Sequence, residues 1–294
     1  MRGSVRILAV MAAAAVCSVG SAGAVRAEDV PGPDRAVQAD APADKSRSGA
    51  PETRTAAQGQ DAAGDAGDTC EVPSYLLTSD AELPKVADAI KARRLDILVV
   101  GGGSSQLAGP DGANASYPAR LEAALRERLS GIAVNVATVP QFKKTAADVA
   151  PGLENLAKER KPTLIIWQTG TIDALRAVDP DDFRAAVDSG LAALAEAGTD
   201  VVVMNLQYSP RMETMISVGP YLDNLRVGAQ EHGVPLFDRF SMMRYWNESG
   251  RFDLFNPSHG LGLAKRVHDC IGQALASFVI DAAHLSTEEL RVQH

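Results

Sequence analysis

The sequence predicts an α/β protein, a three-layer α/β/α sandwich built on a parallel five-stranded sheet. Two observations support this prediction. Between residues 70 and 283, short apolar runs alternate with amphipathic stretches of helical length. The apolar runs are nearly continuous, which is typical of parallel strands that are buried on both faces. Because the strands alternate with helices, right-handed crossovers should place helices on both sides of the sheet.

The pattern assigns an element to most of this region. Strands are expected at residues 95–100, 132–139, 164–167, 201–206 and 234–237. Helices are expected at residues 117–129, 146–159, 183–197, 221–232, 241–246 and 261–280. Ligands of such sheets bind beyond the carboxyl ends of the strands. This rule draws attention to the loops at 101–106, 140–144, 169–173 and 207–211.

Residues 1–27 are typical of a secretory signal peptide. Arg2 and Arg6 precede an apolar stretch at residues 7–19, and small residues follow it. The apolar stretch is shorter than the about 20 residues that a membrane-spanning helix needs. We therefore expect a mature chain that begins near Glu28, is periplasmic or secreted, and has no membrane span. Lipidation of Cys17 is disfavoured, because Ala-Ala-Val is a poor approach to a lipidated cysteine.

Composition divides the rest of the chain. Residues 28–68 contain no aromatic residue and few large apolar ones, so they are expected to form a disordered linker. Residues 69–283 are expected to form one domain, followed by a tail at 284–294. The formal net charge of −8, with no compensating basic run, argues against a nucleic-acid partner.

Two cysteines remain once the signal peptide is removed. An even pair, Cys70 and Cys270, suggests one disulfide in an oxidising compartment. Such a bond would tie the start of the domain to its last helix. Two separate buried thiols are the alternative.

Three stretches carry a family resemblance. The first is Gly-Gly-Gly-Ser-Ser at 101–105, which is followed by Tyr-Pro-Ala-Arg-Leu at 117–121. The second is Trp-Gln-Thr-Gly-Thr-Ile-Asp-Ala-Leu at 167–175, and the third is the loop and helix start at 252–270. Together they resemble the SGNH/GDSL hydrolases, in the branch that has Gly-Ser-Ser-Ser-Thr in place of Gly-Asp-Ser-Leu. The resemblance implies an SGNH-type, flavodoxin-like sandwich and carboxyl-ester hydrolysis, with no metal and no organic cofactor.

The chemistry of that family depends on a few positions. A Ser attacks the acyl carbonyl, a His accepts its proton, an Asp orients the His, and a backbone N–H, a Gly and an Asn hold the oxyanion. Without gaps, Gly103 stands at the nucleophile, Lys143 near the oxyanion Gly and Gly262 at the base. The turn Gly-Thr-Asn-Asp becomes Gly-Thr-Ile-Asp, so that Ile172 replaces the oxyanion Asn.

Two residues of that turn, Gly170 and Asp173, match the family. Asp173 is expected to cap a turn or to hold the neighbouring loop, which requires no catalytic role.

A shifted register restores part of the constellation. It makes Ser104 the nucleophile and His259 the base, with Asn256 three residues before the histidine. An Asn can orient a histidine but cannot stabilise its charged form, and the corresponding change in serine proteases costs about ten-thousandfold in rate. Ile172 stays unrepaired in both registers.

Two functional hypotheses follow. In the first, the protein is a catalytically impaired or inactive member of the family. It then binds an acylated glycan, or another small-molecule ester of the cell envelope, in the former active-site cleft. In the second, it is a weak acyl or acetyl esterase that uses Ser104 and His259.

Other candidates are weaker. The glycine-rich turn fails the dinucleotide-binding spacing, because Gln106 stands where the last Gly belongs. His232, His268 and His284 lack the spacing of metal ligands and are expected to be surface or cap residues. One aromatic set is expected either to line a sugar-binding rim or to pack the terminal helix on the sheet: Phe240, Tyr245, Trp246, Phe252 and Phe255.

Overall fold

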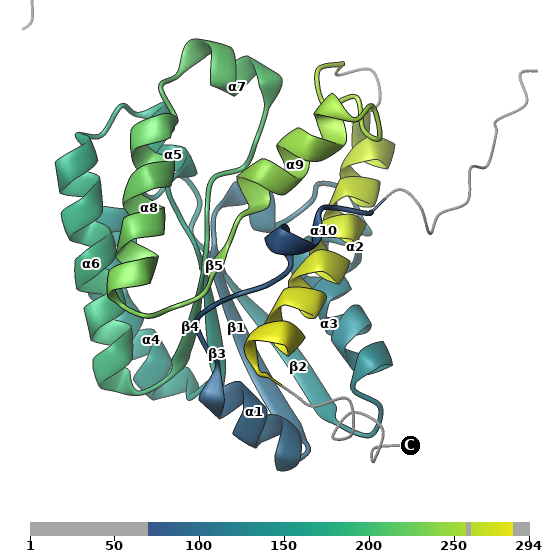
Figure 1. The fold of residues 1–294 in the computed structure, drawn as a ribbon, viewed down its shortest axis with the longest axis vertical. Helices are drawn as coiled ribbons and strands as arrows, with labels where there is room; N and C mark the ends of the chain where they lie inside the picture. Colours follow the sequence, from purple (N-terminus) through teal and green to yellow (C-terminus); the bar gives the residue numbers. More distant parts are fainter. Residues whose placement is uncertain (1–69, 257–259, 285–294) are drawn as a thin grey trace, which may run out of the picture. The chain divides into compact units, whose positions relative to one another are not determined.

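A computed structural model describes residues 70–256 and 260–284. The predictions for residues 1–27, for residues 28–68, for His259 and for most of the tail lie outside the described residues. The domain is a parallel five-stranded sheet with the strand order β2-β1-β3-β4-β5 (Figure 1). The strands are β1 (Arg94–Gly101), β2 (Ala133–Pro140), β3 (Leu164–Gln168), β4 (Asp200–Met204) and β5 (Leu236–Phe237). The predicted fold class is confirmed.

Helices cover both faces of the sheet (Figure 1). One layer consists of α4 (Ala146–Arg160), α6 (Pro180–Ala197) and α8 (Gly219–Glu231). The other contains α1 (Pro84–Lys91), α3 (Tyr117–Arg128) and α10 (Gly260–Ala282), with α10 packed on α3. Helix α9 (Arg239–Glu248) follows β5 directly. Short elements complete the loops: η1 (Ser74–Leu76), η2 (Gly103–Ser105), α2 (Gly112–Ala115), α5 (Thr171–Leu175) and α7 (Pro210–Met215).

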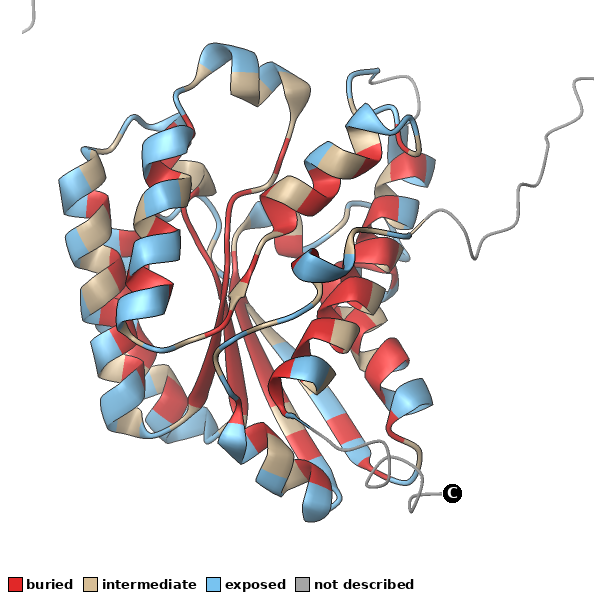
Figure 2. Cartoon of the chain, viewed as in Figure 1, coloured by how far each residue is buried: buried red, intermediate tan, exposed pale blue. Residues whose placement is uncertain are grey.

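The core lies between the sheet and the two helical layers (Figure 2). β3 and β4 are buried along their whole length, as their apolar runs predict. The expectation that every strand is buried on both faces is wrong for β2, in which Ala133, Asn135 and Ala137 are exposed. The reason is that β2 is an edge strand and pairs only with β1.

Local signals explain where some helices begin. Asp179 caps α6 by accepting hydrogen bonds from the backbone N–H groups of Asp181 and Asp182, and Pro180 occupies the first turn, where no N–H is needed. α6 therefore starts three residues before the predicted position. Thr145 and Asp148 form a capping box that starts α4 at the predicted residue.

Cys70 and Cys270 form a disulfide, which confirms the predicted pairing. The bond joins the first described residue to the middle of α10. A hydrogen bond from Nε1 of Trp246 to the backbone oxygen of Glu71 also connects the start of the domain to α9. Within the described part of the chain, no helix is both long enough and apolar enough to cross a membrane.

The register of the sheet positions the site. Gly101 pairs with Pro140, and Gln168 pairs with Met204, which in turn pairs with Phe237. The carboxyl ends of the parallel strands therefore lie along one edge, where the loops that follow them converge.

Candidate functional site

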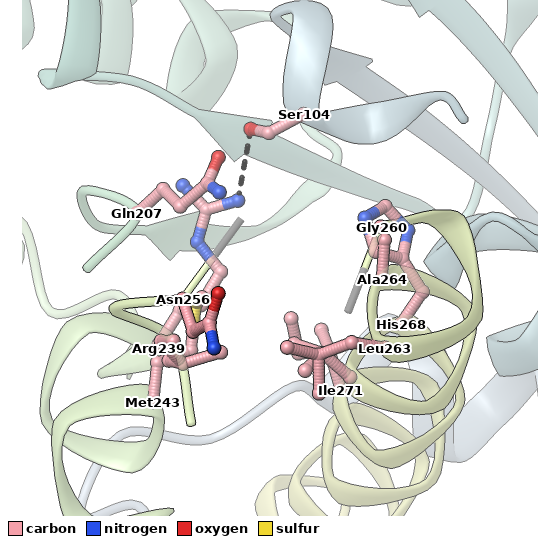
Figure 3. Close-up of a pocket in the computed structure, with 12 residues that line it drawn as sticks. Ser104, Gln207, Arg239, Met243, Asn256, Gly260, Leu263, Ala264, His268 and Ile271 are labelled. Carbon is pink, nitrogen blue, oxygen red and sulfur yellow. Dashed lines mark hydrogen bonds between the residues drawn. The ribbon is translucent and has the colours of Figure 1, made fainter. Parts of the chain in front are cut away.

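A pocket of about 240 Å³ opens at this edge of the sheet (Figure 3). The loop after β1 contributes one side, α9 and the residues after it contribute a second side, and α10 contributes a third. Its polar lining comes from Ser104, Gln207, Arg239, Asn256 and His268, and its apolar lining from Met243, Leu254, Leu263, Val267 and Ile271.

Ser104 lies in η2, directly after β1. Its Oγ accepts a hydrogen bond of 2.6 Å from Nε2 of Gln168 and one of 3.1 Å from Nη1 of Arg239. Both partners are donors, and neither can take a proton from the hydroxyl. Within the described residues, Ser104 thus has the environment of a hydrogen-bond acceptor, not that of a serine paired with a general base.

Arg239 is the first residue of α9, and its side chain is 1% exposed. Nη2 donates to the backbone oxygen of Asn205 at 3.1 Å, and Nε has no hydrogen-bond partner. No carboxylate among the described residues forms an ion pair with it. Burial lowers the pKa of the guanidinium to about 10, so the group stays charged near neutral pH. The pocket therefore holds a cation whose protein partners are all neutral.

A buried tyrosine fixes the orientation of Gln168. The Tyr117 hydroxyl donates to Oε1 of Gln168 at 2.8 Å, which leaves Nε2 to face Ser104. Burial raises the pKa of the Tyr117 phenol, so the hydroxyl remains a donor. Hydrogen bonds thus connect Tyr117, Gln168 and Ser104, and in this way link the two motifs that carry the resemblance, at 117–121 and 167–175.

His268 lies on α10 and is 8% exposed. The expected surface position is wrong, because α10 packs on α3 and buries this face, whereas the alternative role as a cap agrees with a contact to the first N–H of α3. Nδ1 accepts a 3.0 Å hydrogen bond from the backbone N–H of Tyr117, so the neutral ring carries its proton on Nε2. Burial, with the positive charge of Arg239 as a second cause, lowers the pKa of His268 to about 4. The ring is therefore a hydrogen-bond donor to the pocket at neutral pH and not a base.

The positions that the alignment without gaps assigns to the catalytic residues do not line the Ser104 pocket. Ile172 and Gly170 line a second cavity of about 20 Å³, together with Gly102 and Lys144. Gln168 borders this small cavity and also contacts Ser104, so it stands between the two spaces. Ile172 does not line the pocket that holds Ser104.

Three further substituted positions are also placed. Gly103 is exposed, and a Cβ added there would meet only Phe142, at 3.9 Å. Lys143 is exposed and has a left-handed backbone with φ of 55°, the conformation that favours glycine. Gly262 is exposed in the first turn of α10 and does not line the Ser104 pocket. From the shifted register, Ser104 and Asn256 share one pocket.

Asp173 is buried in α5, the short helix that follows β3. Its Oδ1 accepts a 2.8 Å hydrogen bond from the backbone N–H of Ala146 at the start of α4, and Oδ2 has no partner. Burial raises the pKa of this carboxyl. The residue ties the loop after β3 to α4.

Three members of the aromatic set pack in the core, as one of the two expected roles requires, and Phe255 is exposed. Phe240, Trp246 and Phe252 are buried, with Trp246 and Phe252 in edge-to-face contact at 5.7 Å. Phe255 is 61% exposed, and the guanidinium of Arg211 lies 5.7 Å from its ring centre. Across residues 70–256 and 260–284, no group of three or more His, Cys, Asp and Glu side chains is arranged to hold a metal ion.

The sequence reasoning missed Arg239 and misjudged His268. A signal for Arg239 exists, because Asp-Arg follows the last apolar run directly, at the carboxyl end of a predicted strand. His268 has no such signal, since its burial depends on how α10 packs on α3.

The chain matches a protein family and is similar to solved structures. A model of the non-GDSL lipase-like family matches residues 69–285. The chain is similar to the solved structure of TesA, with 20% identity, a TM-score of 0.48, and coverage of 61% of this chain and 97% of that one. It is similar to LAE5, an α/β hydrolase from the metagenome of Lake Arreo, Spain, with 19% identity, a TM-score of 0.49, and coverage of 64% of this chain and 96% of that one. It is also similar to a variant of Axe2, an acetyl-xylooligosaccharide esterase from Geobacillus Stearmophilus, with 18% identity, a TM-score of 0.48, and coverage of 64% of this chain and 94% of that one. No curated protein sequence matches the chain significantly.

The family match spans the whole described domain, from the residue before Cys70 to the end of α10. Its limits enclose the sheet, both helical layers and the pocket around Ser104. The chain belongs to the non-GDSL lipase-like family.

Proposed function

We propose that this protein is an exported member of its family in which hydrolysis is impaired or lost. Its pocket binds an acylated glycan or another acylated component of the cell envelope. The observation that carries the proposal is the pair of donors, Gln168 and Arg239, that hold the Oγ of Ser104. Export rests on the signal-peptide pattern of residues 1–27.

The chemistry around Ser104 supports binding over turnover. A serine nucleophile needs a base within hydrogen-bond reach. His268 is the one histidine of the pocket among the described residues, and its proton sits on Nε2 because Nδ1 is occupied. At the position of the family's oxyanion Asn, Ile172 offers no donor, and losing one oxyanion donor costs on the order of a hundredfold or more in rate.

The two walls of the pocket suit an acyl compound. Leu263, Val267 and Ile271 follow one another at intervals of four along α10 and form an aliphatic stripe, and Met243 and Leu254 face the pocket from α9 and the loop after it. The polar groups gather around Ser104 and Arg239. An acyl chain fits the aliphatic stripe, while oxygen atoms fit the donors.

Weak ester hydrolysis by Ser104 and His259 is the second candidate. One observation favours it: the Arg239 guanidinium contacts the Oγ of Ser104, and a neighbouring cation lowers the pKa of a hydroxyl. The hydroxyl also shares its pocket with Asn256, which precedes His259 by three residues.

A test of turnover separates the two candidates. We expect the purified protein to hydrolyse a short-chain aryl ester no faster than its Ser104→Ala variant, and a serine-directed phosphonate to leave Ser104 unlabelled. Ser105→Ala is the matched control, because the Oγ of that neighbouring serine donates to the backbone oxygen of Gly102 instead of entering the pocket. Labelling of Ser104, together with turnover that is lost in Ser104→Ala and in His259→Ala but kept in Ser105→Ala, would overturn the binding proposal.

A further inference from the structure

The Arg239 guanidinium has no counter-ion among residues 70–256 and 260–284. It has five N–H groups, of which the hydrogen bonds to Ser104 and Asn205 use two. Both acceptors are neutral oxygens. Burying an ionised group without an opposite charge is unfavourable, and the penalty is relieved when an anion binds next to it.

The surroundings of the guanidinium also suit an anion. None of the described residues that line the pocket is an Asp or a Glu. His268 lines the same space, and its neutral ring carries its proton on Nε2, because its Nδ1 accepts from the Tyr117 N–H. Figure 3 shows the Arg239 guanidinium beside Ser104 and the His268 ring on the α10 side of the same pocket. A cation and a neutral donor thus line a space to which the described residues contribute no negative charge.

The single positive charge of Arg239 and the aliphatic lining of the pocket favour a carboxylate over a phosphate. A phosphate monoester carries close to two negative charges near neutral pH, whereas Arg239 supplies one positive charge. A carboxylate carries a single charge, and its planar shape matches the fork of a guanidinium. The aliphatic stripe of Leu263, Val267 and Ile271 leaves room for an alkyl chain and offers no partner to a second polar group.

We propose that the pocket binds the free carboxylate of a short- or medium-chain fatty acid, with the carboxylate paired to Arg239 and the alkyl chain along α10. The inference deepens the proposed function and rests on it in one respect, namely that the pocket accepts acyl chains. It adds that the preferred ligand is the charged acid and not its ester.

The first experiment uses the unaltered full-length protein. Calorimetric titrations at pH 7 compare hexanoate with hexanamide, methyl hexanoate and inorganic phosphate. Hexanamide has nearly the same shape as hexanoate but no charge. Because a hydrogen bond to a charged group is stronger than one to a neutral group, we expect hexanoate to bind at least about tenfold more tightly than hexanamide. Inorganic phosphate should bind more weakly than hexanoate, because it cannot use the aliphatic stripe.

The second experiment changes the cation. Arg239→Met keeps a long side chain and removes the charge, and no carboxylate among the described residues would be left unpaired. We expect a folded variant that binds hexanoate at least about tenfold more weakly, and a clearly smaller loss for hexanamide, whose oxygen carries no full charge. Arg244→Met is the matched control on the same helix, because Arg244 is half-exposed and pairs with Glu213 and Glu248. It should bind hexanoate as the unaltered protein does.

The outcomes distinguish the two proposals. If none of the three hexanoyl compounds binds, the acyl-binding function itself is wrong. If the ester or the amide binds as tightly as hexanoate, or if hexanoate binding survives Arg239→Met, the function stands and the carboxylate proposal is overturned. Equal binding of phosphate and hexanoate also overturns it in favour of a general anion site. If Arg239→Met fails to fold, the comparison of hexanoate with hexanamide on the unaltered protein decides.

Discussion

The backbone N–H of Tyr117 donates a 3.0 Å hydrogen bond to Nδ1 of His268. The first residue of α3 thereby sets which nitrogen of a histidine on α10, 151 residues later in the chain, faces the pocket. A catalytic histidine needs the opposite arrangement, with a free nitrogen acceptor turned towards the serine. The contact therefore links the packing of α3 on α10 to the loss of a base.

The lowered pKa of His268 predicts acid sensitivity. The pKa of about 4 in the folded protein lies below the ordinary histidine value of 6.5, so the unfolded chain binds more protons between these values. Stability is therefore complete above about pH 6.5 and is lost as the pH falls towards 4. We expect a loss of about 2 kcal/mol in the free energy of unfolding between pH 7 and pH 5, measured by urea denaturation.

A variant isolates this effect. His268→Asn retains an acceptor for the Tyr117 N–H and has no titrating ring, so it should lose that part of the pH dependence. His284→Asn, which changes a half-exposed histidine, should leave the dependence as it is. Parallel pH profiles for the unaltered protein and His268→Asn would contradict the assignment.

Tyr117→Phe should destabilise the domain. The substitution removes the donor to Oε1 of Gln168 and leaves a buried amide oxygen without its partner. We expect a cost of about 1–3 kcal/mol, measured by chemical denaturation. Tyr75→Phe is the control, because Tyr75 is 71% exposed. Equal stability of the two variants would show that the Tyr117 hydroxyl contributes little to the domain.

Gly170→Ala should be poorly tolerated. Gly170 has φ of 91°, and an added Cβ would lie 2.6 Å from Cδ1 of Leu206. The combined backbone and steric strain should cost about 2–4 kcal/mol. Gly152→Ala in α4 is the contrast: nothing lies within 4 Å of its added Cβ, and alanine is favoured over glycine within a helix by about 1 kcal/mol. Thermal melts should therefore move in opposite directions.

Lys143→Gly should stabilise the protein slightly. Its left-handed backbone, with φ of 55°, is unfavourable for a residue with a Cβ. Relief of this strain should outweigh the extra flexibility of the unfolded glycine, for a net gain of about 0.5 kcal/mol. Lys144→Gly lacks such strain to relieve and should destabilise the protein by a similar amount. A loss of stability in Lys143→Gly would indicate that the turn is not strained.

Reduction of the Cys70–Cys270 disulfide should lower the free energy of unfolding by about 2–5 kcal/mol. Denaturation with and without reductant measures the difference. Mass analysis without reductant should find no free thiol at either position, and two free thiols would refute the bond.

Most of the sheet could be predicted from the sequence, because β1, β3 and β4 are buried apolar runs that no helical pattern imitates. β5 is harder, since only Leu236 and Phe237 pair within the predicted segment at 234–237. The elements missed between strands, such as α2 and α5, have four and five residues. Such lengths are too short to show a helical period.

Only some residues of the candidate site could be predicted from the sequence. Ser104 and Asn256 could be found because each belongs to a motif with a fixed spacing. Arg239 and His268 could not be joined to them, since Arg239 contacts Ser104 across 135 residues of chain and His268 contacts Tyr117 across 151. The conclusion that Ile172 removes a donor remains a prediction, and the structure adds that its side chain borders a different cavity.

The disulfide has a consequence for when the pocket becomes complete. Cys270 lies two residues after His268 and one before Ile271, on the helix that forms the aliphatic stripe. Disulfides form in oxidising compartments and are rare in the reducing cytosol. In a precursor kept in the cytosol, the disulfide would be absent and α10 would not be linked to the start of the domain. Ligand binding by the pocket would then develop only after the two cysteines are oxidised.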